Sequence, residues 1–381
     1  MINILYICTP NSIHDLKWMS YFSSQKDKYR VFAVGETNIY LTLKELVDLE
    51  SMGIHVLKAI NGFSLLNIYS TTLTILRLRQ YIAKYRIDIV HAFVATPFAL
   101  WLNFLGTKYV ITTRGTDVLI TLPNLKSKKV FNIKDKILFL LFKRSFKNAS
   151  LVTCTSMSQI ESVRRMFKVK HLELIRTGVN VHEINSLTYC SGYLPNQKYV
   201  LFPRYLNNPN YNVELQIESI KKLPKVIIED YIFIFIKKDG YMDDFSKKIQ
   251  FELESLKSKI SLKYLVFDYL GQADLWSLYK NASLVVMTPL SDGTPNSALE
   301  TMSAKCPLIL PNLKYDDDLF NETCIKLETY DSSELARNIE RALYEYPENY
   351  IFKAYDNVQN YGNRLVEMTR LSKHYDEILK F

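Results

Sequence analysis

Short apolar runs alternate with longer amphipathic stretches along the whole chain. The short runs are rich in β-branched residues, as expected for buried strands, and the stretches between them favour helices. This alternation indicates βα units and parallel sheets rather than a β-sandwich. The predicted strands are residues 2–8, 30–34, 54–58, 87–92, 108–113, 151–155, 172–176, 199–203, 231–236, 263–268, 283–288, 307–310 and 324–328.

A polar, turn-rich segment at residues 188–198 interrupts this series before it restarts. The predicted fold class is therefore α/β, with two doubly wound Rossmann-like domains at residues 1–190 and 196–356. A final helical stretch at about 357–381 follows no further strand. It can pack back on either domain, and we assign it to the first.

The spacing of the 11 glycines excludes several common sites, because no two glycines are closer than nine residues. A phosphate loop, a dinucleotide-binding fingerprint and a nucleophile elbow all need glycines closer together than that. The chain therefore carries none of these three motifs.

The five cysteines and six histidines show no spacing typical of a disulfide framework or a metal site. We expect a reducing compartment and no metal or other cofactor. The first residues predict a strand rather than a signal peptide, and no apolar run is long enough to span a bilayer. The expected location is the cytoplasm.

The net charge of +9 is concentrated in the first half, where residues 1–195 carry about +13 and residues 196–381 about −4. Residues 126–147 combine eight basic side chains with one acid around an apolar set. This pattern is typical of a segment that lies on an anionic membrane surface. A domain helix with a solvated basic face is an equal alternative. Nucleic acid is not an expected partner, because no binding motif accompanies the charge.

The segment 287–310 carries the most specific chemistry: a strand end, an Asp-Gly turn and a helix that starts at Pro295. The free N–H groups from Asn296 onward would suit a phosphate. Glu300 can accept hydrogen bonds from a ribose diol, and Asp292 can hold sugar hydroxyls or stabilise a developing positive charge. On pattern alone, an ordinary helix start with solvated acids is equally consistent.

This segment resembles the donor-binding motif of the retaining nucleotide-sugar glycosyltransferases of family 4 (glycosyltransferases group 1), whose fold is GT-B. In that motif two acidic residues with seven residues between them bracket a glycine-containing turn, and Asp292 and Glu300 form the pair here. Four further segments resemble family motifs in the same order: 87–92 with His91, 112–118 with Arg114 and Asp117, 174–180, and 201–220 with Arg204.

The chain also departs from the family pattern. Pro10 and Asn11 follow the first strand in place of paired glycines, and Arg114 stands where the family has histidine. Tyr211 and Asn212 replace the usual Lys-Gly after the predicted diphosphate-binding arginine. The backbone of 293–297, with Arg114, is expected to compensate for the missing lysine.

The resemblance implies transfer of a sugar from a nucleoside diphosphate sugar, expected to be a UDP-sugar, to an acceptor hydroxyl with retention and without metal. The implied catalytic residues are Asp292, Asp117 and His91, and the implied acceptor-side residues are His14 and Arg114. The implied donor-binding residues are Arg204, Gly293, Thr294, Pro295, Asn296, Ser297 and Glu300.

The basic first half suggests a glycan or lipid-linked acceptor of bacterial surface polysaccharide biosynthesis. The protein would then contact the inner face of the cell membrane peripherally through residues 126–147. Two alternatives stay open: a nucleotide-sugar 2-epimerase of the same fold, and a non-catalytic protein that binds a sugar nucleotide or a membrane.

Overall fold

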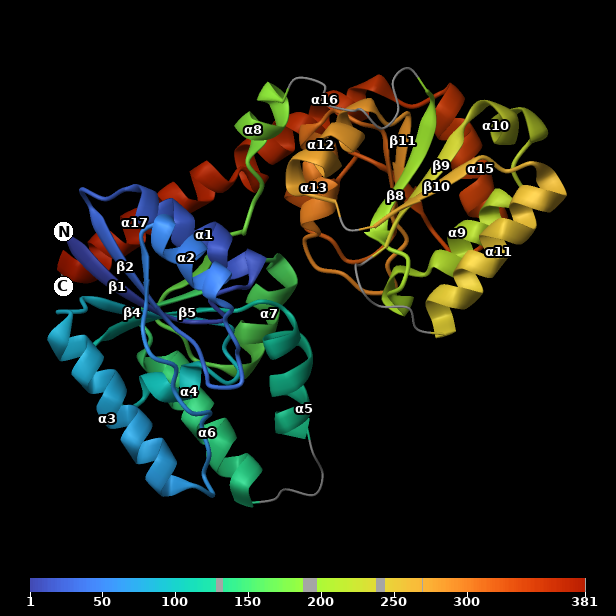
Figure 1. Cartoon of the computed structure of the whole chain (residues 1–381). Coiled ribbons are helices and arrows are strands. Elements are labelled where there is room, and N and C mark those ends of the chain that lie inside the picture. The colour runs from blue at the N-terminus through green and yellow to red at the C-terminus, as the bar shows by residue number, and fades with distance from the viewer. Residues whose placement is uncertain (128–132, 188–196, 238–243, 269, 381) are drawn as a thin grey trace. The chain divides into compact units, whose positions relative to one another are not determined.

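The computed structural model describes residues 1–127, 133–187, 197–237, 244–268 and 270–380, which form two compact units (Figure 1). Unit 1 comprises Met1–Thr177 and Leu365–Phe381, and unit 2 comprises Gly178–Arg364. The domain boundary expected between residues 190 and 196 lies outside the described residues, as does Cys190. The other four cysteines are buried and free.

Within the described residues, unit 1 contains a seven-stranded sheet in the order β3-β2-β1-β4-β5-β6-β7. Neighbouring strands are all parallel. Apolar side chains on both faces explain why the strands read as near-continuous apolar runs. The strands are β1 (Ile2–Ile7), β2 (Tyr29–Val34), β3 (Ile54–Val56), β4 (Ile89–Phe93), β5 (Lys108–Thr112), β6 (Leu151–Cys154) and β7 (Leu172–Leu174).

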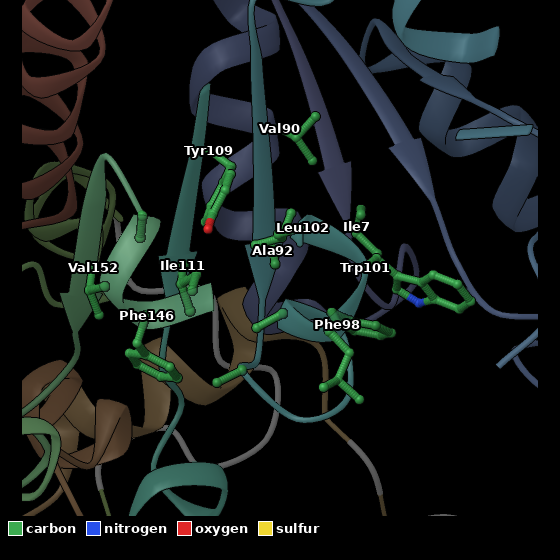
Figure 2. Close-up of a cluster of buried hydrophobic side chains, with 14 of the residues drawn as sticks. Ile7, Val90, Ala92, Phe98, Trp101, Leu102, Tyr109, Ile111, Phe146 and Val152 are labelled. Carbon is green, nitrogen blue, oxygen red and sulfur yellow. The ribbon is translucent and has the colours of Figure 1, made fainter. Parts of the chain in front are cut away.

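Helices cover both faces of this sheet. One buried cluster joins the sheet to α3, α4, α6 and α7, and Figure 2 shows part of it, with Ile111 and Val152 from strands and Phe146 from α6. A second cluster joins the opposite face to α1, α2 and α17. The helices are α1 (Ile13–Ser24), α2 (Leu43–Ser51), α3 (Ile68–Lys84), α4 (Ala99–Leu102), a π-helical turn (Asp117–Thr121), α5 (Leu122–Ser127), α6 (Ile133–Asn148), α7 (Met157–Met166) and α17 (Arg364–Lys380).

In the described part of unit 2, a six-stranded parallel sheet has the order β10-β9-β8-β11-β12-β13. Its strands are β8 (Tyr199–Tyr205), β9 (Ile232–Ile236), β10 (Tyr264–Phe267), β11 (Leu284–Val286), β12 (Leu308–Pro311) and β13 (Ile325–Leu327). Its helices are α8 (Val181–Ser186), a 3-10 turn (Pro209–Tyr211), α9 (Val213–Ile220), α10 (Lys225–Asp230), α11 (Asp244–Ile260), α12 (Gln272–Asn281), α13 (Asn296–Ser303), α14 (Asp317–Phe320), α15 (Ser332–Tyr344), α16 (Glu348–Asn357) and a π-helical turn (Val358–Gly362).

The predicted α/β class with parallel sheets is confirmed. Each strand predicted from the sequence is found among the described residues, and its ends differ from the prediction by at most two residues. The final stretch departs from expectation, because it is not one continuous helix. Asn363 adopts an extended backbone and forms a parallel bridge with Val179, which separates the π-helical turn from α17.

The C-terminal helix α17 completes the core of unit 1. Its side chains Met368, Leu371 and Tyr375 are fully buried against the sheet and α1. Tyr375 contacts Phe22 and Tyr29 through its ring. The last helix of the chain therefore packs on the first unit, although unit 2 intervenes in the sequence.

The basic segment 126–147 forms part of the fold of unit 1. Its residues 128–132 lie outside the described residues, and the remainder belongs to α5 and α6. Phe142 and Phe146 of α6 are buried in the core, whereas Ile133 and Leu140 are exposed. Helix α6 is thus a domain helix that also presents apolar and basic side chains to solvent. Among the described helices, none is both long and apolar enough to cross a membrane.

Candidate active site

The order of the strands in unit 2 identifies a candidate ligand site at the carboxyl edge of its sheet. Strand β8 lies between β9 and β11, so the chain winds outward from it in both directions. In open α/β sheets, ligands bind in the crevice beyond the carboxyl ends at this switch point. Arg204 lies near the end of β8, and Asp292 lies in the loop after β11.

The side chain of Arg204 connects this loop to the helix that follows it. Its Nη2 forms an ion pair with Asp292 Oδ2 at 2.9 Å, and its Nη1 donates a hydrogen bond to Ser297 Oγ at 2.8 Å. The guanidinium carbon lies 4.2 Å from the centre of the Tyr211 ring. Both charged side chains are 19% exposed, so the cluster is shielded and still reachable from solvent.

Hydrogen bonds between two loops hold this cluster in place. The Leu290 N–H donates to the Asn210 carbonyl, and the Asn210 side chain donates to the Ser291 carbonyl at 2.9 Å. Thr288 donates to the Tyr211 carbonyl at 3.0 Å. The loop after β8 and the loop after β11 are therefore fixed to each other, which positions Tyr211 and Asp292 on the same arginine.

Helix α13 starts at Asn296, one residue later than predicted, and extended Pro295 precedes it. The first intrahelical bonds run from the Ala298 and Leu299 N–H groups to the Pro295 carbonyl. The N–H groups of Asn296 and Ser297 consequently lie before this ladder and point out of the helix start. Such N–H groups favour an anion.

The turn that precedes the helix has free space beside Gly293, and a hydrogen bond from Thr294 holds it to the neighbouring loop. A Cβ atom added at Gly293 would meet no atom of the described chain within 4 Å apart from its immediate neighbours in sequence. Thr294 donates to Asp316 Oδ2 at 3.2 Å, and Asp316 is buried. This contact gives Asp316 a structural role, because its carboxylate holds Thr294 of the turn.

Glu300 lies one turn after Ser297 and is 6% exposed. Its Oε1 accepts a hydrogen bond from Gln272 Nε2 at 3.4 Å. Burial lowers the pKa of Arg364, and the nearby carboxylate of Glu300 partly offsets this shift. A buried carboxylate at this depth in the helix can accept hydrogen bonds from a diol, as the resemblance implies.

Sequence reasoning missed the partners of these residues. Gln272 and Arg364 carry no motif that would have identified them. Tyr211 departs from the family pattern in sequence. In the structure its ring packs on the Arg204 guanidinium, so the tyrosine has a structural role at this position. An aromatic face next to a guanidinium stabilises the cation and holds its plane.

In unit 1, Arg114 is enclosed by its own partners. Its Nη2 forms an ion pair with Asp15 Oδ1 at 2.9 Å, and its Nη1 donates to Thr177 Oγ1 at 3.0 Å. The guanidinium lies 5.1 Å from the Trp18 ring and 5.0 Å from the Phe93 ring. Burial raises the pKa of Asp15, and Arg114 opposes that shift. Sequence reasoning did not identify Asp15.

His14 and Asp117 follow strands at the same edge of this sheet. His14 is exposed on the first turn of α1, and its carbonyl lies 3.4 Å from Arg114 Nη2. Asp117 is 2% exposed and accepts hydrogen bonds from four backbone N–H groups at 2.8–3.3 Å, those of Ala95, Arg114, Gly115 and Val118. These contacts give Asp117 a positioning role in the loops.

His91 lies inside the core of unit 1 and is fully buried. Its Nδ1 is hydrogen-bonded with the Tyr375 hydroxyl at 2.5 Å, and its Nε2 with Thr112 Oγ1 at 2.6 Å. Burial, with a smaller contribution from Arg114, lowers the pKa of His91 well below its usual value. Both ring nitrogens are therefore engaged in hydrogen bonds within the core. Catalytic roles for His91 and Asp117 stay predictions that this geometry does not favour.

The lowered pKa of His91 predicts a pH-dependent contribution to stability. His91 is neutral in the folded protein, whereas in the unfolded chain it gains a proton below about pH 6.5. The contribution of neutral His91 to the free energy of unfolding is complete above that pH. It is lost as the pH falls, by up to about 1.4 kcal/mol per pH unit. Urea unfolding of wild type and His91→Gln at pH 8 and pH 5.5 should show the larger decrease for wild type. Equal decreases would contradict this assignment.

No group of three or more His, Cys, Asp or Glu side chains suited to a metal ion occurs among the described residues. The structure brings Arg204, Asp292, Ser297 and Glu300 together around the start of α13. It places Arg114, Asp117 and exposed His14 together in unit 1, and it places His91 in the core.

Comparisons with known proteins match the two halves of the chain to two family profiles. The sequence profile described as Glycosyltransferase Family 4 matches residues 24–183, and the profile described as Glycosyl transferases group 1 matches residues 194–363. Among proteins with curated descriptions, none matched the chain.

Several solved structures share the fold of the whole chain. A glycosyltransferase from Rickettsia africae ESF-5 is 16% identical with a TM-score of 0.77, covering 100% of this chain and 99% of that one. Anabaena Alr3699/HepE in complex with UDP is 14% identical with a TM-score of 0.73, covering 99% of each chain. A sucrose-phosphate synthase from Thermosynechococcus elongatus is 15% identical with a TM-score of 0.69, covering 100% of each chain.

The two matched profiles together span most of the chain, and they divide it as the two sheets do. The chain therefore belongs to the glycosyltransferases of the GT-B fold, with a family 4 domain followed by a group 1 domain.

Proposed function

We propose that this glycosyltransferase moves a sugar from a UDP-sugar to a hydroxyl of a glycan or lipid-linked acceptor, with retention of configuration and without an active-site metal. The observation that carries the proposal is the cluster of Arg204, Asp292 and Ser297 at the start of α13. A guanidinium and a helix N-terminus together suit a diphosphate.

The donor chemistry follows from these contacts. Arg204 and the N–H groups at the start of α13 would bind the diphosphate, and Glu300 would bind the ribose. UDP is favoured because Anabaena Alr3699/HepE has been solved with UDP and with UDP-glucose. A trehalose-phosphate synthase from Burkholderia xenovorans with the same fold is described as UDP-forming.

The ion pair between Arg204 and Asp292 gives the site a means to respond to the donor. A diphosphate would compete with Asp292 for the guanidinium, which would free the carboxylate to contact the sugar. Negative charge then grows on the leaving phosphate oxygen during transfer. Fixed donors beside that oxygen stabilise the transition state more than the ground state.

The acceptor side is assigned to unit 1. The exposed His14 and the loops that Asp117 holds lie at the carboxyl edge of its sheet. The excess of basic residues in the first half favours an anionic or lipid-linked acceptor, such as a growing bacterial surface polysaccharide on the cytoplasmic face of the membrane. Peripheral membrane contact through residues 126–147 is part of this proposal.

A panel of UDP-, GDP-, ADP- and CMP-sugars in the presence of EDTA tests the function. We expect slow release of UDP from one UDP-sugar, and NMR of the transferred sugar should show the anomeric configuration of the donor. Glu300→Ala should weaken donor binding and slow this release, because the ribose loses its hydrogen-bond acceptor.

The same panel separates the alternatives. Interconversion of the donor sugar without an acceptor would indicate the 2-epimerase. Stabilisation by a UDP-sugar without turnover on any acceptor would indicate a non-catalytic binding protein. If a folded sample shows neither release nor donor-induced stabilisation, the proposed transferase activity is wrong.

A further inference from the structure

Unit 1 contains an apolar pocket that the donor chemistry does not use. It has a volume of about 540 Å³. It lies where the loops after β3, β4 and β5 meet α5 and α6, so it opens at the carboxyl edge of the sheet. Eight of its thirteen described lining side chains are apolar, among them Phe63, Leu100, Ile120, Leu125, Leu138 and Phe142.

The pocket is connected to the predicted acceptor side through Asp117. The carboxylate of Asp117 accepts hydrogen bonds from the Ala95 N–H at 2.8 Å and the Val118 N–H at 2.9 Å. The two segments that it fixes continue directly into the pocket wall at Thr96 and Ile120. A molecule in the pocket would therefore lie beside the loops that we assign to the acceptor.

The charges around the pocket are complementary to an anion. Lys134 is the single charged residue among the described residues that line it. The described parts of α5 and α6 also carry Lys126, Lys136, Lys143, Arg144 and Lys147 against one acid, Asp135. Apolar side chains close to these basic residues in the sequence are also exposed: Ile120 is 54% exposed and Ile133 is 75% exposed.

We propose that this pocket binds the hydrocarbon chain of a lipid-linked acceptor, and that Lys134 interacts with the phosphate that links the chain to the sugar. The apolar walls would remove the chain from water, and Lys134 with the other basic residues of α5 and α6 would attract its anionic head. This inference rests on the proposed function and deepens it, because it selects the lipid-linked acceptor over a free glycan.

Alkyl phosphates of increasing length, from butyl to decyl and kept below micelle formation, serve as the probe in calorimetric titrations of the full chain. We expect the affinity to rise about fourfold for each added methylene until the pocket is filled. Inorganic phosphate, which has no chain, should bind far more weakly. Ile120→Gln should reduce the gain per methylene, and Lys134→Gln should weaken all the alkyl phosphates by a similar factor.

Matched controls separate the pocket from general binding to a basic surface. Leu119→Gln changes an exposed neighbouring side chain that does not line the pocket, and Lys44→Gln removes an exposed lysine of α2; both should leave the titrations unchanged. All four positions are exposed in the fold, so melting temperatures should stay close to wild type. An affinity independent of chain length, or equal losses in the control variants, would overturn the assignment.

A parallel measurement keeps this inference distinct from the proposed function. Stabilisation of the wild-type protein by a UDP-sugar is recorded on the same samples. A normal donor effect without a chain-length effect would refute the pocket and leave the transferase proposal intact. The absence of both effects would count against both.

Discussion

Replacing Arg204 with alanine is expected to lower kcat/KM for sugar transfer roughly 10²- to 10³-fold. The guanidinium connects Asp292 to Ser297 at the start of α13 and lies at the switch point of the unit 2 sheet. Under the proposed function, its loss would remove the fixed cation from the leaving diphosphate. The variant also removes the ion pair that holds the Asp292 carboxylate in place. Steady-state release of the nucleoside diphosphate measures the effect.

Two further variants make this result interpretable. Arg204→Lys keeps the charge but not the forked geometry, so we expect an activity between wild type and Arg204→Ala. Arg337→Ala removes an exposed arginine of α15 in the same unit and should change little. An Arg204→Ala variant that folds normally and retains activity within a factor of three would show that the diphosphate is bound elsewhere.

Replacing Asp117 with alanine is expected to lower the free energy of unfolding by about 3–5 kcal/mol. The carboxylate accepts hydrogen bonds from four backbone N–H groups in a site that is 2% exposed. Alanine would leave these donors buried without an acceptor. Urea unfolding followed by circular dichroism measures the loss.

The controls for this prediction separate the loss of the acceptor from the loss of a charge. Asp117→Asn keeps one oxygen acceptor but introduces an amide group near backbone donors, so an intermediate loss is expected. Asp48→Ala removes an exposed acid from α2 and should change the free energy of unfolding by no more than about 0.5 kcal/mol. If Asp117→Ala is as stable as Asp48→Ala, the loops do not depend on this carboxylate.

Much of the fold was predictable because parallel strands buried on both faces leave a local signature. Strands such as β9 and β11 are apolar throughout, and a helix follows each of them, α11 and α13 respectively. The bridge between Asn363 and Val179 was not predictable, because it joins residues far apart in the sequence. The amphipathic pattern on both sides favoured one continuous helix, although Gly362 beside Asn363 is a poor helix former.

The candidate site was predictable only in part. The motif around Asp292 and Glu300 identified the segment, since the spacing of two acids around a turn is a local property of the chain. It did not reveal that Asp292 forms an ion pair with Arg204, which lies 88 residues away in the sequence. The family resemblance also implied a catalytic role for His91, and the burial of this side chain depends on the packing of α17 against the sheet.

The α/β class, the strand series and the family motifs could be predicted from the chain alone, because each of these depends on the spacing of residues that are close together in the chain. The pairing of the charged side chains depends on the folded structure: Arg204 pairs with Asp292, Arg114 pairs with Asp15, and Asp117 accepts from four backbone N–H groups. The fold also places the last helix in the core of the first unit and an apolar pocket beside the loops that Asp117 holds. Such pairings arise from packing between distant segments, which local patterns do not encode.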